Sequence, residues 1–297
     1  MYIIKGAETT RDSALAFLAD GGKVACITEY LRYLKHVRMN CDGFAIRPGK
    51  VAVDGTLLQL DDYKERLTQW QRKGVTTVLV LCDIEKDADL RESLKHARHR
   101  LINSSIDYVI GVSYPMRKIT PSFIRLCKRE KVPFLLARVY EESDVSAVAW
   151  EWIRDAQFPY RFPIVPDFGT CSSYDRSTKS PLSDWLETAK HNQIRTWAGF
   201  DNECPMLSKK ALRMIGIAPL KGELRAGGDL DYVLYRRGRL ADPNELPYHE
   251  EGDNQERNPD VVVLRGRLMK AGKTVYYRPG YGKEIPIRVP GFLTYYS

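Results

Sequence analysis

The 297-residue chain has little histidine and no closely spaced cysteines, and both shortages exclude common kinds of metal site. Six cysteines are scattered along it, at positions 26, 41, 82, 127, 171 and 204. Because no Cys-x-x-Cys pair occurs, we expect reduced, mostly buried thiols and no structural zinc cluster. The five histidines lie at positions 36, 96, 99, 191 and 249. None ends an apolar run that could be a strand, which is where a barrel enzyme builds its site.

Long apolar runs and a secretion signal are also lacking. No run approaches the roughly 20 residues that a membrane helix needs. The first residues, Met1–Gly6, lack the basic patch, apolar stretch and cleavage site of a signal peptide. We therefore expect a cytoplasmic protein without membrane insertion.

Acidic residues are outnumbered, since 46 Lys and Arg against 38 Asp and Glu give a net charge of +8. The basic residues form short clusters, such as Lys95–Arg100 and Arg236–Arg239, which are typical of solvated helix faces and loops. Binding of nucleic acid or another anionic partner through this surface is therefore a minor alternative.

A continuous β-branched and apolar run, Val75–Cys82, predicts a strand covered on both faces in a parallel sheet. It ends at Asp83, where a catalytic carboxylate could lie. The preceding residues 62–73 place Tyr63, Leu67 and Trp70 on one helical stripe. Gly74 fits the left-handed residue that ends such a helix.

Helices and strands continue to alternate after this unit, which predicts βα units with right-handed crossovers. Thr120 and Pro121 are a favourable N-cap and first residue for one of these helices. The predicted elements are a helix at 87–101, a strand at 106–113, a helix from 120, a strand at 132–140, a helix at 144–156, a strand at 162–165 and a helix at 181–191. An eight-unit barrel usually takes about 250 residues. The span from Val51 to Leu212 is much shorter, so some units must be abbreviated or absent.

The two ends of the chain differ from the middle, because they predict short strands with glycine turns nearby. These strands are 2–4, 23–27, 232–235, 261–264 and 274–277. We expect them to form one small β domain assembled from both termini. The acidic stretch 241–259 is interpreted as a solvated loop inserted into that domain.

Five motifs occur in an order that resembles the amidohydrolase superfamily, particularly its dihydroorotase, hydantoinase and dihydropyrimidinase branch. They are Gly22–Ile27, Pro48-Gly49, Gly74–Val78, Ile215–Leu234 and Leu264–Leu268. The resemblance implies an α/β fold: a reduced or incomplete TIM-like (β/α) barrel at 51–221, beside a small β-sandwich of 1–50 plus 222–297. It also implies a homo-oligomer, a dimer or a tetramer.

The same resemblance implies that the catalytic metal centre has been lost. In this family a His-x-His pair follows the Pro-Gly, and those positions fall on Asp54 and Thr56, with the family's nearby Asp at Ala52. The bridging lysine of the family falls near Leu135. Threonine is a poor zinc ligand and leucine cannot bind a metal, so we expect no metal and no cofactor.

Other chemistry remains open at the predicted strand ends. Asp54, Asp83, Asp167 and Asp175 could provide paired carboxylates for acid and base catalysis, although aspartates at strand ends are also ordinary helix caps. Thr56 and Arg138 are candidate ligand-binding residues.

Three further features have plainer interpretations. Cys82 has no histidine placed to activate it and is interpreted as a buried thiol. His96 and His99 are interpreted as part of a solvated helix face. Gly227-Gly228-Asp229 lacks the Lys-Ser/Thr of a phosphate-binding loop and matches the family's closing turn.

The sequence favours a non-catalytic binding, scaffolding or regulatory protein with the amidohydrolase scaffold, with a protein partner possible. One alternative is an enzyme, either a hydrolase of cyclic amides or other C–N bonds with atypical active-site residues, or one with new chemistry at the strand ends that uses Asp54, Asp83 and Asp167. A second alternative is a weak binder of anionic partners through the basic surface.

Overall fold

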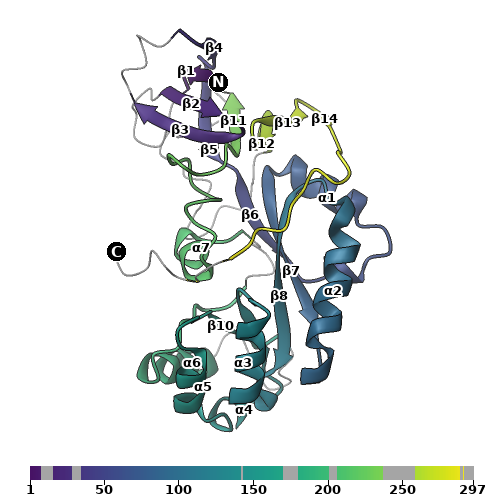
Figure 1. The fold of residues 1–297 in the computed structure, drawn as a ribbon, viewed down its shortest axis with the longest axis vertical. Coiled ribbons are helices and arrows are strands. Elements are labelled where there is room, and N and C mark those ends of the chain that lie inside the picture. Colours follow the sequence, from purple (N-terminus) through teal and green to yellow (C-terminus); the bar gives the residue numbers. More distant parts are fainter. Residues whose placement is uncertain are drawn as a thin grey trace.

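The computed structural model describes residues 1–7, 16–28, 35–141, 143–169, 180–200, 206–236, 258–287 and 290. Its centre is a curled parallel sheet with the strand order β10-β9-β8-β7-β6 (Figure 1). The strands are β6 (Lys50–Asp54), β7 (Val75–Asp83), β8 (Asp107–Pro115), β9 (Leu135–Arg138) and β10 (Ile164–Asp167). All neighbours pair in parallel. The prediction of an α/β fold with a reduced barrel is confirmed by this half-barrel.

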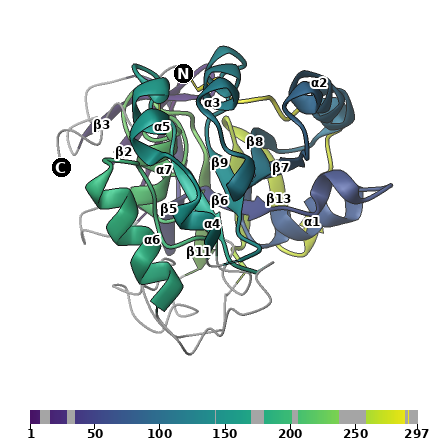
Figure 2. The same cartoon turned by 90° about the horizontal axis from the view of Figure 1, so that it is seen from below.

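Helices cover both faces of this sheet. Those on the outer face bury one large hydrophobic cluster against it, whereas α7 lies on the inner face (Figure 2). The helices are α1 (Lys64–Arg72), α2 (Leu90–Arg100), α3 (Pro121–Arg129), α4 (Ser143–Ser146), α5 (Trp150–Gln157), α6 (Ser180–His191) and α7 (Lys209–Ile215). None of the described helices is long and apolar enough to cross a bilayer.

Local signals in the sequence set several of these boundaries. Gly74 follows α1 with φ +86°, a backbone conformation that glycine adopts without strain. Thr120 caps α3, because its Oγ1 accepts the Phe123 N–H at 3.1 Å and Pro121 occupies the first helical position. The predicted helix stop and helix start are therefore both confirmed.

The inner face of the half-barrel is filled by apolar side chains. One cluster joins Val51 and Val53 of β6, Leu79 and Leu81 of β7, Val109 of β8, Phe134 and Leu136 around β9, and Val165 of β10 to Leu212 and Ile215 of α7. Trp197 and Phe200 pack against this cluster, and the Phe200 ring contacts the Phe134 ring edge-on. Where a full barrel would continue with more strands, this chain places a packed core.

The two outer strands of the sheet are each covered by irregular backbone. At the β10 edge the Ile164 N–H donates to Arg195 O at 2.9 Å. At the β6 edge the Leu207 N–H donates to Val51 O at 2.9 Å. The backbone at Arg195 thus covers one edge of the sheet and the backbone at Leu207 covers the other, which protects edges that would otherwise pair with another chain.

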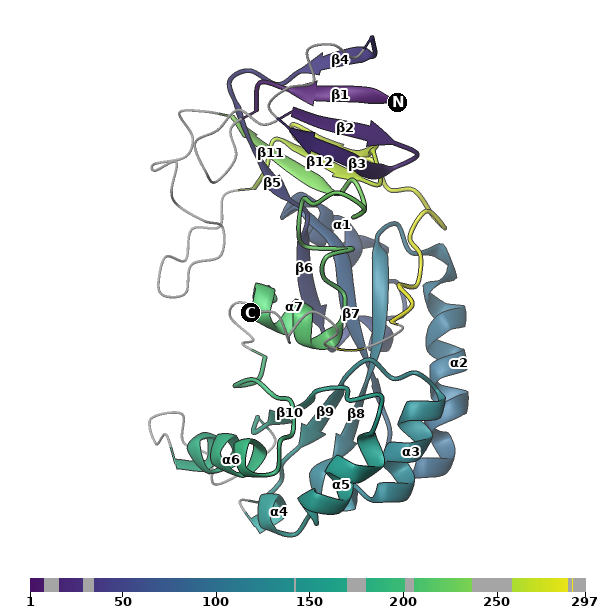
Figure 3. The ribbon, with the colours of Figure 1, turned by 60° about the vertical axis from the view of Figure 1, so that its left-hand side comes forward.

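Two further sheets lie together at one end of the parallel sheet (Figure 3). The first has the order β3-β2-β1-β4 and the second the order β14-β13-β12-β11-β5. Their strands are β1 (Tyr2–Lys5), β2 (Ala16–Asp20), β3 (Lys23–Thr28), β4 (Val37–Asn40), β5 (Phe44–Pro48), β11 (Tyr232–Arg236), β12 (Val261–Leu264), β13 (Arg267–Ala271) and β14 (Thr274–Val275). Ile4 and Phe17 of the first sheet share a hydrophobic cluster with Ile46 and Leu234 of the second.

After β14 the chain returns to the parallel sheet. Tyr108 in β8 donates its N–H to Lys283 O at 3.0 Å and accepts the Ile285 N–H at 2.9 Å. Ile285 and Ile287 then enter the inner-face cluster. We call residues 281–287 the C-terminal strap.

Some predicted boundaries were wrong. The single helix predicted at 144–156 is two helices, α4 and α5, and the Trp150 Nε1 at the start of α5 donates back to Val145 O at 2.7 Å. The strand predicted at 132–140 is only Leu135–Arg138, because Pro133 has no N–H for the ladder. The strand at 162–165 begins instead at Ile164, after Pro163, and the one at 274–277 ends at Val275. Asp175 and nearly all of the acidic stretch 241–259 lie outside the described residues.

Candidate functional site

The carboxyl edge of the parallel sheet carries polar side chains on its inner face. Side chains alternate between faces along a strand, and Leu79 and Leu81 of β7 belong to the inner cluster, so Asp83 is on the inner face too. The same alternation places Ser113 (β8), Arg138 (β9) and Asp167 (β10) on that face. Asp83 pairs in register with Ser113, and Arg138 with Asp167.

Asp54 is on the other face. Its neighbour Ala52 belongs to the outer cluster, and its carboxylate is directed at α1. Oδ2 accepts from Arg66 Nε at 2.6 Å and from Trp70 Nε1 at 2.7 Å, while Oδ1 accepts from Thr56 N at 3.1 Å and Thr56 Oγ1 at 2.9 Å. Burial alone would raise the pKa of Asp54, but these hydrogen bonds and the Arg66 charge lower it below its usual value. Both oxygens are therefore occupied in anchoring β6 to α1.

The other two candidate carboxylates share a face but are not neighbours. Asp83 is exposed and its Oδ2 accepts from Gln59 Nε2 at 3.2 Å. Asp167 Oδ1 accepts the Gly169 N–H at 2.9 Å. Strands β8 and β9 lie between them, which separates the two residues by roughly 14 Å along the sheet. The structure therefore does not bring Asp54, Asp83 and Asp167 together.

Arg138 connects the end of β9 to the loop that follows β7. Its Nη2 donates to Ile84 O at 2.8 Å and to Glu85 Oε1 at 2.5 Å, and Lys118 Nζ also pairs with Glu85, at 3.2 Å. The hydrogen bond from Lys118 and the charge of Arg138 lower the pKa of Glu85. Arg138 Nε is buried and has no hydrogen-bond partner among the described residues. The guanidinium is thus the one candidate side chain here with a spare buried donor.

The remaining sequence candidates have ordinary surroundings. Thr56 is exposed apart from its bonds to Asp54, and Leu135 is wholly buried in the outer cluster. Cys82 is buried, as predicted, and burial raises the pKa of its thiol to about 12. His96 and His99 are exposed on α2, which confirms the solvated face.

A buried cluster of charges, missed by the sequence reasoning, lies at the opposite end of the sheet. The Lys221 Nζ contacts Asp107 Oδ2 at 2.5 Å, Asp229 Oδ2 at 2.7 Å and Asp231 Oδ2 at 2.7 Å. Arg265 pairs with the other oxygen of Asp107. We call these five side chains the Lys221 cluster. Its sequence signal was present, since Lys221, Asp229 and Asp231 interrupt an apolar motif, but Asp107 and Arg265 are remote from that motif.

The Lys221 cluster is almost completely enclosed. Lys221 and Asp107 are fully buried, and Asp231 is 3% exposed. Burial alone would lower the pKa of Lys221, but the three carboxylates raise it above its usual value. Burial raises the pKa of Asp231 to about 6, which Lys221 only partly counteracts.

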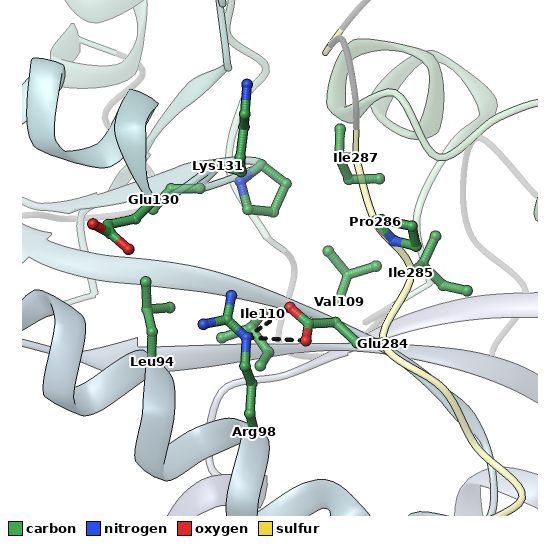
Figure 4. A pocket seen from close by; sticks show the side chains of 12 residues that line it. Leu94, Arg98, Val109, Ile110, Glu130, Lys131, Glu284, Ile285, Pro286 and Ile287 are labelled. Atoms are coloured by element: carbon green, nitrogen blue, oxygen red, sulfur yellow. Dashed lines mark hydrogen bonds and ion pairs between the residues drawn. The ribbon is translucent and has the colours of Figure 1, made fainter.

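A cavity of about 500 Å³ is also found away from the carboxyl edge. It lies between α2, β8, the turn before β9 and the C-terminal strap (Figure 4). Leu94, Val109 and Ile287 line its apolar part. Its lining also includes an ion pair, in which Arg98 Nε donates to Glu284 Oε1 at 3.1 Å and to Oε2 at 3.0 Å.

The residues at the carboxyl edge do not fit a divalent metal centre of the kind the family resemblance implies. Asp54 points to the outer face, Thr56 is exposed, and Leu135 is apolar. Within the described part of the chain, one group of three metal-type ligands occurs, Asp107, Asp229 and Asp231. The Lys221 ammonium lies within 2.7 Å of all three carboxylates. That group is thus already filled by a side-chain cation.

Comparison with known proteins supports the fold. No family model and no curated protein matches the sequence. Among solved structures, a D-hydantoinase from a Bacillus species superposes with TM-score 0.66 at 11% identity, over 98% of this chain and 99% of that one. A dihydropyrimidinase from Brevibacillus agri gives TM-score 0.61 at 11% identity, over 96% and 98%. A zinc-complexed atrazine chlorohydrolase from Arthrobacter aurescens gives 0.52 at 10% identity, over 94% and 96%. The chain thus shares its fold with these hydantoinase and dihydropyrimidinase structures, as the resemblance implied.

Proposed function

We propose that the chain is a non-catalytic derivative of the amidohydrolase scaffold that acts as a binding, scaffolding or regulatory protein. The observation that carries this proposal is the packed inner face of the half-barrel. Phe134, Leu136 and Val165 pack there against α7 and Leu207. In a full barrel, further strands would close around this interior and complete the ring of strand ends at which substrate and reacting groups meet, whereas here α7 and Leu207 pack on the inner face of only five strands.

The side chains at the metal-ligand positions support the same proposal. Asp54 uses both oxygens to hold Arg66, Trp70 and Thr56, so removing a proton from substrate or water would break the anchor between β6 and α1. Asp83 and Asp167 are too far apart to act on one small molecule as a close pair. The candidate carboxylates at this edge therefore offer no close pair that could activate a water molecule in place of a metal ion.

The proposal extends to the domain organisation. We infer a composite β-sandwich of residues 1–50 and 222–297, since strands from both stretches share one hydrophobic cluster. We infer a barrel-like domain of residues 51–221. A homo-oligomer, a dimer or a tetramer, stays a prediction that follows from the resemblance, and a cytoplasmic location stays a prediction too.

One observation favours a second candidate, a hydrolase of C–N bonds with atypical residues. The buried Arg138 Nε has no hydrogen-bond partner among the described residues, and Arg138 lies on the inner face, the same face as Asp83 and Asp167. A guanidinium could orient a carbonyl or carboxylate beside one carboxylate acting as a base. We rank this candidate second, because Glu85, the acidic side chain that contacts Arg138 within the described part of the chain, already accepts a hydrogen bond from its Nη2.

Metal analysis and an activity assay on the purified protein test the proposal together. We expect less than about a tenth of an equivalent of zinc, manganese or iron, because no group of three metal-type ligands lies together at the carboxyl edge among the described residues. We also expect no hydrolysis of hydantoin or dihydrouracil above the buffer rate. Tightly held stoichiometric metal would contradict the proposal.

A matched pair of variants separates true activity from contamination. Asp83→Asn and Asp167→Asn change the second candidate's carboxylates, whereas Asp155→Asn changes an exposed aspartate paired with Arg154. If Asp83→Asn and Asp167→Asn abolish hydrolysis and Asp155→Asn keeps it, the protein is a hydrolase, as the second candidate function states. Hydrolysis unchanged in all three would come from a contaminant.

A further inference from the structure

The Lys221 cluster contains more negative than positive charge. Three carboxylates, Asp107, Asp229 and Asp231, face two cations, Lys221 and Arg265. No other ion pair to these carboxylates is found among the described residues. One surplus negative charge is therefore enclosed in the protein interior, where an uncompensated charge is costly.

The cluster lies where separate parts of the chain meet. Asp107 is the first residue of β8, and Lys221, Asp229 and Asp231 belong to the segment that leads from α7 into β11. Arg265 occupies the turn between β12 and β13, and its N–H donates to Asp231 Oδ1 at 2.7 Å. The C-terminal strap joins through the Lys283 N–H, which donates to Asp107 Oδ1 at 2.9 Å. The cluster thus connects the parallel sheet to the β11–β12–β13 sheet.

Asp231 is the carboxylate best placed to lose its charge. It faces Asp107 from β8, Lys221 and Asp229 from its own segment, and Arg265 from the β12–β13 turn. Burial opposes its ionisation most strongly, and the neighbouring Asp107 carboxylate adds to that effect. A proton on Asp231 would remove the surplus charge and could be shared with a neighbouring carboxylate.

We propose that the Lys221 cluster takes up one proton in mildly acidic solution, and that this proton strengthens the connection between the parallel sheet and the β11–β12–β13 sheet. The direction of the stability change with pH follows from the pKa of Asp231 in the folded and unfolded chain. Burial raises the pKa of Asp231 to about 6 in the folded chain, against about 3.9 in an unfolded chain. The resulting stabilisation is complete below about pH 3.9 and is lost as the pH rises through about 6.

Carboxyl NMR of the wild-type protein tests the proton directly. With aspartate labelled at Cγ, we expect one carboxyl signal to titrate with a midpoint of about pH 6. Ordinary aspartates are ionised by about pH 5. The protection factors of the Arg265 and Lys283 amides, corrected for intrinsic exchange, should fall between about pH 5 and about pH 7.5. If no aspartate titrates above about pH 5, or if these amides keep constant protection, the proposal is overturned.

A variant assigns the proton to its residue. Asp231→Asn has no titrating group at this position, so the signal near about pH 6 and the change in urea midpoint between about pH 5 and about pH 7.5 should both disappear. Asp155→Asn, exposed and outside the cluster, should keep both. Persistence of the signal in Asp231→Asn would refute the assignment. If that variant does not fold, the wild-type titration and amide protection still decide the proposal.

Discussion

The two ends of the same parallel sheet differ in how they hold charge. At the carboxyl end, Asp83 and Asp167 are at least partly open to solvent, and Arg138 is bound to a loop carboxylate on the surface. At the amino end, Lys221 and Asp107 are wholly enclosed. In enzymes of this architecture the carboxyl end carries the chemistry and the amino end the stability. Here the buried charge cluster found among the described residues lies at the amino end, in line with the stabilising role of that end.

Lys221→Met should disrupt the Lys221 cluster at the amino end of the sheet and cause the largest loss of stability among these variants. Removing the ammonium leaves three buried carboxylates with only Arg265 to compensate them, so we expect a loss of about 3–5 kcal/mol in the free energy of unfolding. Urea denaturation followed by circular dichroism measures it. Lys118→Met, at a largely exposed ion pair of the carboxyl end, is the matched control and should cost at most about 1 kcal/mol. Equal losses in both variants would remove the contrast between the two ends.

Leu79→Ala tests whether the inner face is a packed core. Leu79 is fully buried there, and its truncation should cost about 2–5 kcal/mol, because the surroundings cannot close the cavity completely. The same denaturation experiment applies. A loss below about 1 kcal/mol would indicate that the inner face is loosely filled and is not a packed core.

Asp54→Asn sharpens the comparison at the carboxyl end, since Asp54 is the one buried carboxylate there among the sequence candidates. We expect a loss of about 1–3 kcal/mol near neutral pH, because Arg66 and Trp70 lose a charged acceptor. The folded-state pKa of Asp54 is lowered. Its contribution is therefore present above about pH 4 and disappears as the pH falls through the folded value. The difference between variant and wild type should shrink in acid, and a constant difference from neutral pH downwards would argue against this ionic role.

Asp83→Asn and Asp167→Asn should have the smallest effects. Each carboxylate accepts one hydrogen bond, from Gln59 or from Gly169, at a partly or fully exposed position. We expect changes within about 0.5 kcal/mol in the free energy of unfolding. A strong stabilisation by either substitution would indicate electrostatic strain held at this edge, as catalytic sites often show.

How much was predictable depended on how local the signal was. The run Val75–Cys82 and the cap at Thr120 were visible, because strand burial and helix capping depend on a few adjacent residues. The split between α4 and α5 was missed, since it depends on a Trp150 ring that packs against Trp185 from a distant helix. The orientation of Asp54 was missed as well, because the choice of face follows from the pairing of β6 with β7.

The sequence by itself determined the alternation of strands and helices, the absence of histidine ligands at the expected positions and the order of the family-like motifs. Tertiary structure alone decided which carboxylates are neighbours. Asp107 and Lys221 are separated by 114 positions yet meet at 2.5 Å, while Asp83 and Asp167, both at strand ends, stay apart. Local propensities depend on residues close in the chain, whereas the pairing of charges depends on strand order and on which surfaces are buried together.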